Sequence, residues 1–374
     1  MLPLIASVDD LRRQGRDVSA TLPTDDYLQR LLLNTNWAHL LEPATYPESK
    51  TLHPGHVAAR RFHTAEQQYT LVNQALEVLL SGIALLQRDD LSAVEWAMNE
   101  ITDNVLTHAE CPLGGVLQVS TFEKARKVGV GVVDSGRGIL ESLREGHRGL
   151  ADDADAIYRA LEAGVTRHSD IGQGNGLAGA LRIATMSGGS IEITSGRARV
   201  LYRDGESTRF SRGPKQKFRG TFVYFEIDLD TPFDISVALD FGRGTHRPAD
   251  LVETLYETDD GNALTLRLKG EQAGFGSRLA GRQMRTKCLN LLNAEPNKPL
   301  LLDWAGISLI SSSFADELVG KLFAELGPLA FSARVRNTGM RPVVHGLIDK
   351  AIMQRAGQAA AQAREDAESP ANED

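Results

Sequence analysis

The chain carries Glu100-Ile-Thr-Asp-Asn104, followed by Asp134-Ser-Gly-Arg-Gly138 and Gly172-Gln-Gly-Asn-Gly-Leu177. The first stretch lies in a helical pattern, because apolar residues recur at every third or fourth position over residues 91–109. The second follows residues 127–133, which are almost continuously apolar and predict a strand buried on both faces. The third directly precedes another helical pattern. Helices that alternate with strands in this way predict an α/β domain.

One stripe of the helix predicted over residues 91–109 is polar. Glu100, Asn104 and His108 recur at every fourth residue and therefore share one side of the helix. An asparagine carbonyl is a hard oxygen ligand that suits Mg²⁺. A glutamate one turn earlier can deprotonate an attacking group. The alternative is a solvated polar face of an amphipathic surface helix.

The second stretch combines a carboxylate with two glycines. Asp134 directly follows the buried strand, and its carboxylate can accept a hydrogen bond from the exocyclic amine of adenine. Gly136 and Gly138 lack side chains, so a base and a ribose can lie against the backbone there. An ordinary Asp-Ser-Gly turn at a strand end is the alternative.

The third stretch is rich in glycine. Gly172, Gly174 and Gly176 precede a predicted helix, and backbone N–H groups at a helix start can bind phosphate. The same region also matches the dinucleotide-binding pattern GxGxxG, but that fingerprint requires a buried strand before its first glycine. The preceding residues 166–170 are polar instead, and the chain contains no P-loop.

Thr221 directly precedes the residues 222–227 and stands where the last predicted strand of the first domain starts. Its hydroxyl can reach the rim of a bound adenine, although it is also compatible with an ordinary strand threonine. With the helix stripe, the strand end and the glycine turn, it predicts a pocket for ATP and Mg²⁺.

In this order, the three stretches resemble the N, G1 and G2 boxes of the GHKL superfamily. The resemblance covers about residues 65–230 and implies a two-layer α/β sandwich, with a mixed sheet and helices on one face. It implies that Glu100 is the general base, Asn104 the Mg²⁺ ligand and Asp134 the adenine contact. The full set of implied ATP-binding residues is Asn104, Asp134, Gly136, Gly138, Gly172, Gly174, Asn175, Gly176, Leu177 and Thr221.

The resemblance also implies a lid. Residues 139–171 would close over the nucleotide, with Thr166 and Arg167 near the γ-phosphate, unless they form a solvated loop. Within the superfamily, the Glu-x-x-x-Asn-x-x-x-His pattern is most similar to that of the anti-sigma-factor serine kinases. The upstream hairpin with a phosphoacceptor histidine, which is typical of histidine kinases, is missing.

A smaller α/β domain is predicted over residues 235–355. Its stretch from Leu300 to Glu317 resembles the central strand, loop and helix of a STAS-like domain, and Phe275-Gly-Ser-Arg278 also fits. In anti-sigma-factor antagonists, a serine in this turn is the kinase substrate. The candidate phosphorylation sites are Ser311, Ser312 and Ser313. One of these serines can instead cap the helix that follows.

The remaining segments are shorter. Residues 1–45 resemble a shortened STAS-type α/β segment, with a strand predicted over Val18–Leu22. Residues 46–64 are predicted to be a linker, because prolines are frequent there. Residues 356–374 are rich in alanine, glutamate and glutamine and are predicted to be a disordered tail.

Composition limits the class of protein. Hydrophobic residues make up 42% and charged residues 24% of the chain, as in ordinary globular proteins. The net charge of -8 argues against a main role in binding nucleic acid, and the basic run over residues 197–219 also contains acidic residues. Cys111 and Cys288 lack disulfide or zinc spacing. We therefore expect a cytoplasmic protein that does not enter the membrane.

Two functions fit these features. The first is an ATP-dependent serine kinase that acts as a signalling regulator on a protein partner or on its own STAS-like domain. The second is an ATPase that drives a conformational switch in a larger assembly, without kinase activity. A nucleotide sensor without turnover is a third, but simple binding requires no base such as Glu100. A homodimer is compatible with each function.

Overall fold

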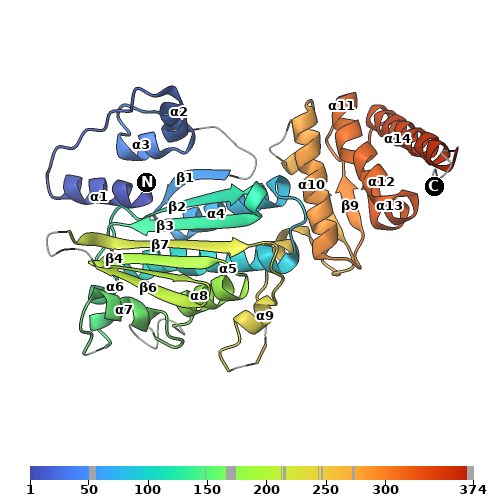
Figure 1. Ribbon diagram of the computed structural model, residues 1–374. Coiled ribbons are helices and arrows are strands. Elements are labelled where there is room, and N and C mark those ends of the chain that lie inside the picture. The colour runs from blue at the N-terminus through green and yellow to red at the C-terminus, as the bar shows by residue number, and fades with distance from the viewer. Residues whose placement is uncertain are drawn as a thin grey trace, which may run out of the picture. The chain divides into compact units, whose positions relative to one another are not determined.

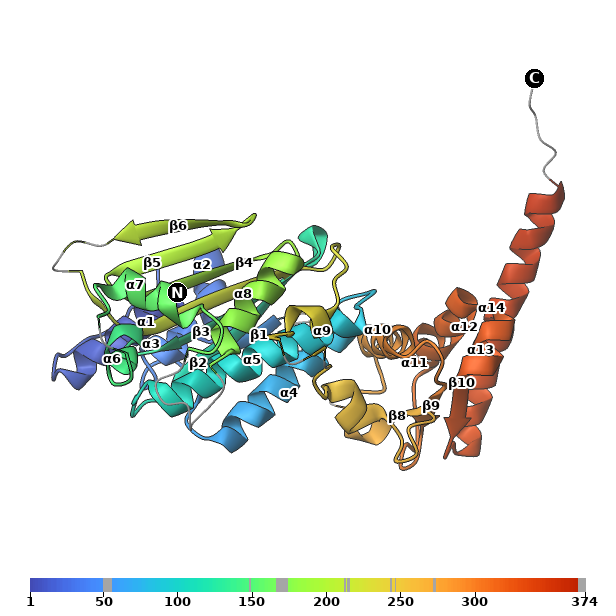
Figure 2. The same ribbon diagram turned by 90° about the horizontal axis from the view of Figure 1, so that it is seen from below.

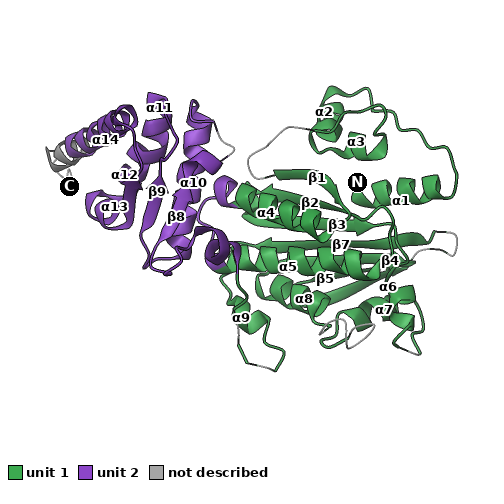
Figure 3. Ribbon diagram, turned by 180° about the vertical axis from the view of Figure 1, so that it is seen from behind, with its two compact units in different colours: residues 1–79, 89–249 green, residues 80–88, 250–374 purple. Residues whose placement is uncertain are grey.

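The computed structural model describes most of the chain, and it divides into two compact units (Figure 3). The described residues are 1–49, 56–147, 149–165, 174–211, 213, 216–242, 244–245, 247–271 and 274–368, with the backbone alone for 362–368. Unit 1 contains Met1–Leu79 and Asp89–Ala249, and unit 2 contains Leu80–Arg88 and Asp250–Asp374.

Unit 1 is built on a seven-stranded sheet (Figure 1). In spatial order, its strands are β1 (His56–Phe62), β2 (Gly115–Phe122), β3 (Lys127–Asp134), β7 (Phe218–Asp228), β4 (Ser190–Gly196), β5 (Ala198–Arg203) and β6 (Glu206–Ser211). Each neighbouring pair is antiparallel, so the prediction of a mixed sheet is wrong. The reason is that tight turns join β2 to β3, β4 to β5 and β5 to β6, and such turns produce antiparallel pairs.

The central strand β3 is buried along almost its whole length, as predicted. Val128, Val130 and Val132 alternate with glycines in its first part. Gly129 and Gly131 leave room for other side chains, since a Cβ at either position would lie within 3 Å of Tyr224 or Leu2, respectively. The alternation therefore keeps one side of β3 filled by its own valines and the other by side chains from neighbouring elements.

One face of the sheet is covered by the long helices α4 (Ala65–Gly82) and α5 (Arg88–His108), together with α8 (Gly176–Met186) (Figures 2 and 3). Their buried residues follow the helical period, as in Ala97, Ile101 and Val105 of α5. Shorter helices connect the strands along the chain: η1 (Glu123–Ala125), α6 (Ile139–Arg144) and α7 (Asp153–Ala160). Helix α9 (Ile235–Ala238) follows β7.

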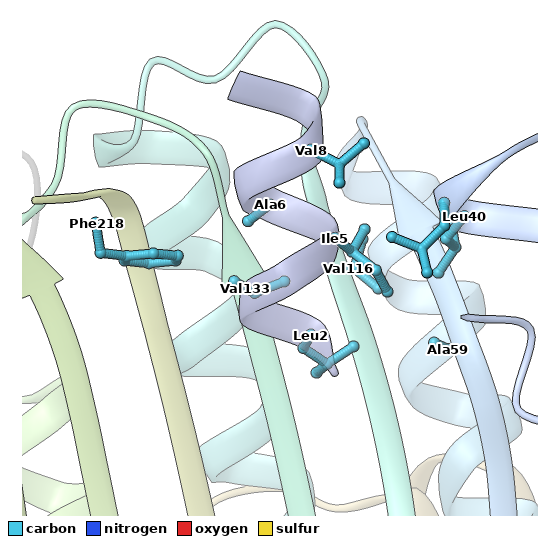
Figure 4. Packing of buried hydrophobic residues seen from close by; sticks show 10 residues of the cluster. Leu2, Ile5, Ala6, Val8, Leu40, Ala59, Val116, Val133 and Phe218 are labelled. Carbon is cyan, nitrogen blue, oxygen red and sulfur yellow. The ribbon is translucent and has the colours of Figure 1, made fainter. Parts of the chain in front are cut away.

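The opposite face is covered in part by α1 (Leu2–Arg13), so the expectation of helices on one face is wrong (Figure 4). Leu2, Ile5 and Val8 of this helix are buried in a cluster with Val116, Val133 and Phe218. These strand residues project away from the long helices and need an apolar cover, which the N-terminal segment supplies.

The regular secondary structure of the N-terminal segment, residues 1–45, consists of helices. After α1 come α2 (Asp26–Asn34), which is capped by Asp25, and α3 (Trp37–Leu41). Val18–Leu22 forms no strand, because its partly buried Val18 and Ala20 pack against the α1 cluster in an irregular segment. The α/β expectation for residues 1–45 is therefore wrong, and the predicted linker over residues 46–64 contains strand β1.

Unit 2 contains a three-stranded parallel sheet in the order β10 (Val335–Thr338), β9 (Leu300–Asp303), β8 (Leu264–Arg267). Its helices are α10 (Arg278–Ala294), α11 (Ser312–Ala315), α12 (Lys321–Leu326), α13 (Pro328–Arg334) and α14 (Pro342–Glu368). A π-helical turn, Asp316–Gly320, joins α11 to α12, and Val252–Tyr256 and Leu268–Gly270 form further short helical turns. The smaller α/β domain was thus predicted correctly.

The end of the chain differs from its prediction. Helix α14 continues to Glu368, well into the segment expected to be disordered. Alanine, glutamine, arginine and glutamate have high helix propensity, so the helix can continue there without a core beneath it. Among the described residues, no helix combines the length and apolar character needed to span a membrane.

The turn between α4 and α5 belongs to unit 2 and is fixed by one buried side chain. Asn290 of α10 donates from Nδ2 to the carbonyl oxygens of Leu80, at 2.7 Å, and Ile83, at 2.6 Å. Its Oδ1 accepts from the backbone N–H of Leu86 at 3.1 Å. A single amide thus satisfies three backbone groups at this turn.

Candidate functional site

A cavity of about 680 Å³ lies within unit 1. Its apolar lining includes Val132 of β3 and Val223 of β7, with Ile101 of α5. Residues of α6 and of the start of α8 contribute further lining. This volume is in the range of small-molecule and cofactor pockets.

The polar stripe of α5 faces this cavity. Glu100, Asp103, Asn104, Thr107 and His108 all line it. Glu100, Asn104 and His108 are the three residues of the polar stripe named from the sequence, and Asp103 and Thr107 lie beside them in the lining. They are brought there because the apolar residues of the same helix are buried in the core, which fixes the rotation of the helix.

Glu100 lies beside the start of α8. A Cβ added to Gly176 would be 2.4 Å from Oε2 of Glu100, so only glycine leaves the carboxylate in its present position. Burial raises the pKa of Glu100, and the neighbouring charge of Asp103 raises it further. A carboxylate with a raised pKa holds a proton more readily, as a general base requires.

Asp134 is buried at the end of β3 and is only 4% exposed. Its Oδ1 accepts from the backbone N–H of Gly136 at 2.7 Å, and its carboxylate also accepts from the N–H of Thr221. Burial raises its pKa to about 6, although both hydrogen bonds act in the opposite direction. Asp134 and Thr221 both line the cavity.

The two glycines after Asp134 have different positions. Gly138 lines the cavity with a φ of 81°, a conformation that favours glycine. Gly136 is not among the lining residues, and a Cβ there would lie 2.1 Å from the carbonyl oxygen of Ala109. Gly136 therefore allows the turn to pack on the end of α5, where Arg137 donates from its backbone N–H to Ala109 at 3.0 Å.

The glycine-rich turn reaches the cavity through Gly174, Asn175, Gly176 and Leu177. Gly174 has a φ of 68°, and Oδ1 of Asn175 accepts from the N–H of Gly164 at 3.0 Å. The first turn of α8 contains no acidic residue, so its N–H groups can receive an anion. Gly172, Thr166 and Arg167 lie outside the described residues.

The described lining is acidic. It contains Glu100, Asp103 and Asp134 but neither lysine nor arginine among the residues that the structure describes. An anionic ligand would therefore be repelled unless a cation came with it. The described residues contain no group of three or more His, Cys, Asp or Glu side chains able to hold a metal. The side-chain oxygen of Asn104 could hold a Mg²⁺ ion, which would supply the positive charge that an anionic ligand needs beside this lining.

Sequence reasoning missed one part of the cavity. Trp96 of α5 and four residues after β7 also line it: Leu239, Phe241, Gly244 and Pro248. Trp96 can be found by stepping one helical turn back from Glu100. These four residues lie outside helices and strands and show no periodicity, so the sequence gives no signal for their position.

The candidate phosphorylation sites lie in unit 2 at the start of α11, with Ser311 as its N-cap and Ser312 and Ser313 as its first two residues. Oγ of Ser311 accepts from the N–H of Phe314 at 3.0 Å and caps the helix, as the alternative reading expects. Ser311 and Ser313 also share a hydrogen bond of 3.0 Å between their hydroxyls. Ser312 is exposed, so its hydroxyl is the most accessible of the three.

Comparison with known protein families identifies part of unit 2. Residues 280–344 match the family described as a STAS-like domain of unknown function (DUF4325). No curated protein matches the chain. The matched segment runs from α10 through β9 and β10 into the first turn of α14. The C-terminal part of this chain therefore carries a STAS-like domain.

Proposed function

We propose that unit 1 binds ATP with Mg²⁺ and transfers the γ-phosphoryl group to a serine of a protein partner. The observation that carries this proposal is the convergence of Glu100, Asn104, Asp134 and the Gly174–Leu177 turn on one cavity. These residues come from three separate stretches that resemble the GHKL boxes. The STAS-like domain supports a signalling role, because the nearest resemblance is to kinases that act on STAS-type antagonists.

The cavity offers a distinct position for each part of the nucleotide. At the Asp134 end, the buried carboxylate accepts a hydrogen bond from the adenine amine. At the start of α8, N–H groups and the helix dipole stabilise the phosphates. Asn104 would hold the Mg²⁺ ion, which neutralises phosphate charge in a cavity whose described side chains include three acids.

Glu100 would act as the general base. Its carboxylate removes the proton of the attacking serine hydroxyl as the serine oxygen bonds to the γ-phosphorus. The bond between that phosphorus and the oxygen bridging the β- and γ-phosphates breaks, and ADP leaves with the electron pair. Burial of Glu100, which raises its pKa, favours proton uptake at this step.

The acceptor is a serine of a separate protein or of the STAS-like domain itself. Within the Ser311–Ser313 turn, the hydroxyl of Ser311 already caps α11. Ser312 is the exposed member, and a phosphate there would add negative charge at a helix start, where it is favourable. Ser312 is therefore the first internal acceptor to test.

An ATPase that drives a conformational switch is the second candidate. The observation that favours it is that Leu239, Phe241, Gly244 and Pro248 line the cavity shortly before the chain enters unit 2 at Asp250. In that case, water replaces the serine hydroxyl as the attacking group, and Glu100 keeps its role.

The test is to incubate the full chain with γ-labelled ATP and Mg²⁺ and to follow the label. Phosphate on the protein that disappears in Ser312→Ala identifies an internal acceptor, and label only in free phosphate favours the ATPase. Glu100→Gln is expected to retain ATP binding and to lose turnover by a factor of about 100 or more. Absence of ATP binding to the wild-type chain would contradict both candidates.

A further inference from the structure

Four residues of α5 that line the cavity follow one another at every fourth position. They are Trp96, Glu100, Asn104 and His108. Because an α-helix rises about 1.5 Å per residue, neighbouring members of this series are about 6 Å apart along the helix axis. The series therefore gives positions along the cavity, from Trp96 near one end to His108 near the other.

The proposed adenine contact lies at the C-terminal end of α5. The turn after Asp134 packs there, and the backbone N–H of Arg137 donates to the carbonyl oxygen of Ala109 at 3.0 Å. A nucleotide with its base at Asp134 and its Mg²⁺ ion at Asn104 therefore extends back along the helix. Its γ-phosphate would lie toward Glu100, one turn closer to the start of α5.

Helix α8 runs past the same residues of α5. Its first residue is Gly176, where an added Cβ would lie 2.4 Å from Oε2 of Glu100. One turn later, a Cβ on Gly179 would lie 2.2 Å from the ring of Trp96 and 3.1 Å from the side chain of Leu239. The start of α8 thus lies at the proposed base, and its next turn lies at an apolar part of the cavity.

This part of the cavity, which we call the apolar end, is lined by Trp96, Leu239 and Phe241. Arg182 of α8 donates to the carbonyl oxygen of Asp240 at 2.5 Å and lies 5.0 Å from the centre of the Phe241 ring. The three lining side chains are half-buried rather than fully enclosed. Large apolar side chains that remain partly exposed in a cavity are typical of a surface that receives an apolar group of a ligand.

We infer that the apolar end binds the residue next to the acceptor serine, so that the substrate is a serine flanked by a bulky apolar side chain. This inference rests on the proposed kinase function and specifies its substrate. A base must lie within about 3 Å of the hydroxyl that it deprotonates, which places the serine at Glu100. Because the attacking and leaving oxygens are roughly in line, the serine approaches from the side opposite to ADP, where Trp96 lies.

The spacing agrees with an extended peptide at this position. Such a chain advances about 3.5 Å per residue, so a residue one or two positions from the serine reaches Trp96, about 6 Å beyond Glu100. Two aromatic rings and a leucine side chain can then pack on an apolar neighbour of the serine. Burial of a polar neighbour against them is unfavourable, because its hydrogen bonds to water would be lost.

Two synthetic peptides that differ only beside a single serine test the inference. One is acetyl-Gly-Leu-Ser-Leu-Gly-amide, and the other replaces both leucines by asparagine, which is similar in shape but polar. With the full chain, ATP and Mg²⁺, kcat/KM for phosphate transfer is expected to be roughly tenfold or more higher for the leucine peptide. Equal values, or transfer to neither peptide while ATP still binds, would overturn the inference. Failure of ATP to bind would instead contradict the proposed function, and the inference would fall with it.

Variants of the apolar end separate substrate binding from a structural role. Leu239→Asn and Trp96→Ala should each lower kcat/KM for the leucine peptide by roughly tenfold, without lowering transfer to the asparagine peptide or raising KM for ATP. Tyr69→Ala, which removes a ring that is 60% exposed on α4, is the matched control and should behave as wild type. Thermal unfolding identifies a variant that fails to fold, and Leu239→Asn keeps the shape of the side chain. Unchanged transfer to the leucine peptide in both folded variants would overturn the inference.

Discussion

Gly176 and Glu100 are so close that a methyl group on Gly176 would lie 2.4 Å from Oε2 of Glu100. The start of α8 and the middle of α5 thus come into close contact at the proposed base, and the absence of a side chain at Gly176 allows this contact. The atom in the way is the end of a flexible side chain, so it can move without disturbing the core. A larger residue at position 176 would therefore act on the carboxylate rather than on the fold.

We predict that Gly176→Ala leaves stability nearly unchanged and lowers turnover by at least tenfold, because the displaced carboxylate no longer reaches the attacking hydroxyl. Thermal unfolding and phosphate transfer measured on the same preparation check this. The control is Gly346→Ala in α14, where nothing lies within 4 Å of the added Cβ. Normal turnover in Gly176→Ala would argue against Glu100 as the base.

Asp134 is predicted to reduce stability near neutral pH. Its pKa is about 6 in the folded protein against an ordinary value of 3.8, so the folded state binds the proton more tightly than the unfolded state. Stability from this group is therefore present below about pH 4 and is lost as pH rises through 6. The stability of Asp134→Asn relative to wild type should rise over this range, by about 3 kcal/mol at most. Urea unfolding at several pH values measures it, and a flat difference would contradict the assignment.

The same carboxylate predicts how base recognition depends on pH. Only ionised Asp134 can accept strongly from an amine of adenine, so ATP affinity should fall as pH drops below about 6. Asp134→Asn should bind ATP more weakly at pH 7.5 and show little of this pH dependence. Titration calorimetry with ATP and GTP provides the comparison. An equal loss for both nucleotides would count against a contact with the adenine.

The predictable part of the candidate site depended on periodicity. Glu100 and Asn104 could be assigned to one pocket because a single helix repeats them at its own period. Asp134 could be added because a continuous apolar strand ends there. Phe241 could not, because its segment has no regular structure and its position depends on contacts with Arg182 that are distant in sequence.

The fold shows a similar division. The α/β class and most helices and strands followed from local patterns, but strand direction did not, since it depends on how the connections run. The packing of α1 on the second face of the sheet could not be predicted either, because nothing in residues 2–13 indicates which surface their apolar side will contact. Val116 and Val133 reveal that surface only once the sheet is assembled.

The helix on this second face yields a prediction about stability. Ile5 is fully buried between α1 and the sheet, whereas its neighbour Leu4 is 50% exposed. Ile5→Ala should therefore lower the free energy of unfolding by roughly 2–5 kcal/mol. Leu4→Ala, which removes a similar number of atoms, should change it by less than about 0.5 kcal/mol. Equal effects in urea unfolding would mean that α1 does not pack on the sheet in this way.

The turn between α4 and α5 limits how the protein can be truncated into fragments and affects the order in which unit 2 folds during synthesis. Unit 2 consists of two pieces of chain, so no single cut releases it intact. A fragment that starts at residue 250 would lack Leu80, Ile83 and Leu86, each at most 2% exposed in the whole protein. During synthesis, these residues leave the ribosome some 200 residues before Asn290 arrives to satisfy their backbone groups. Unit 2 can therefore complete its folding only after α10 has been synthesised, although the turn between α4 and α5 is synthesised much earlier.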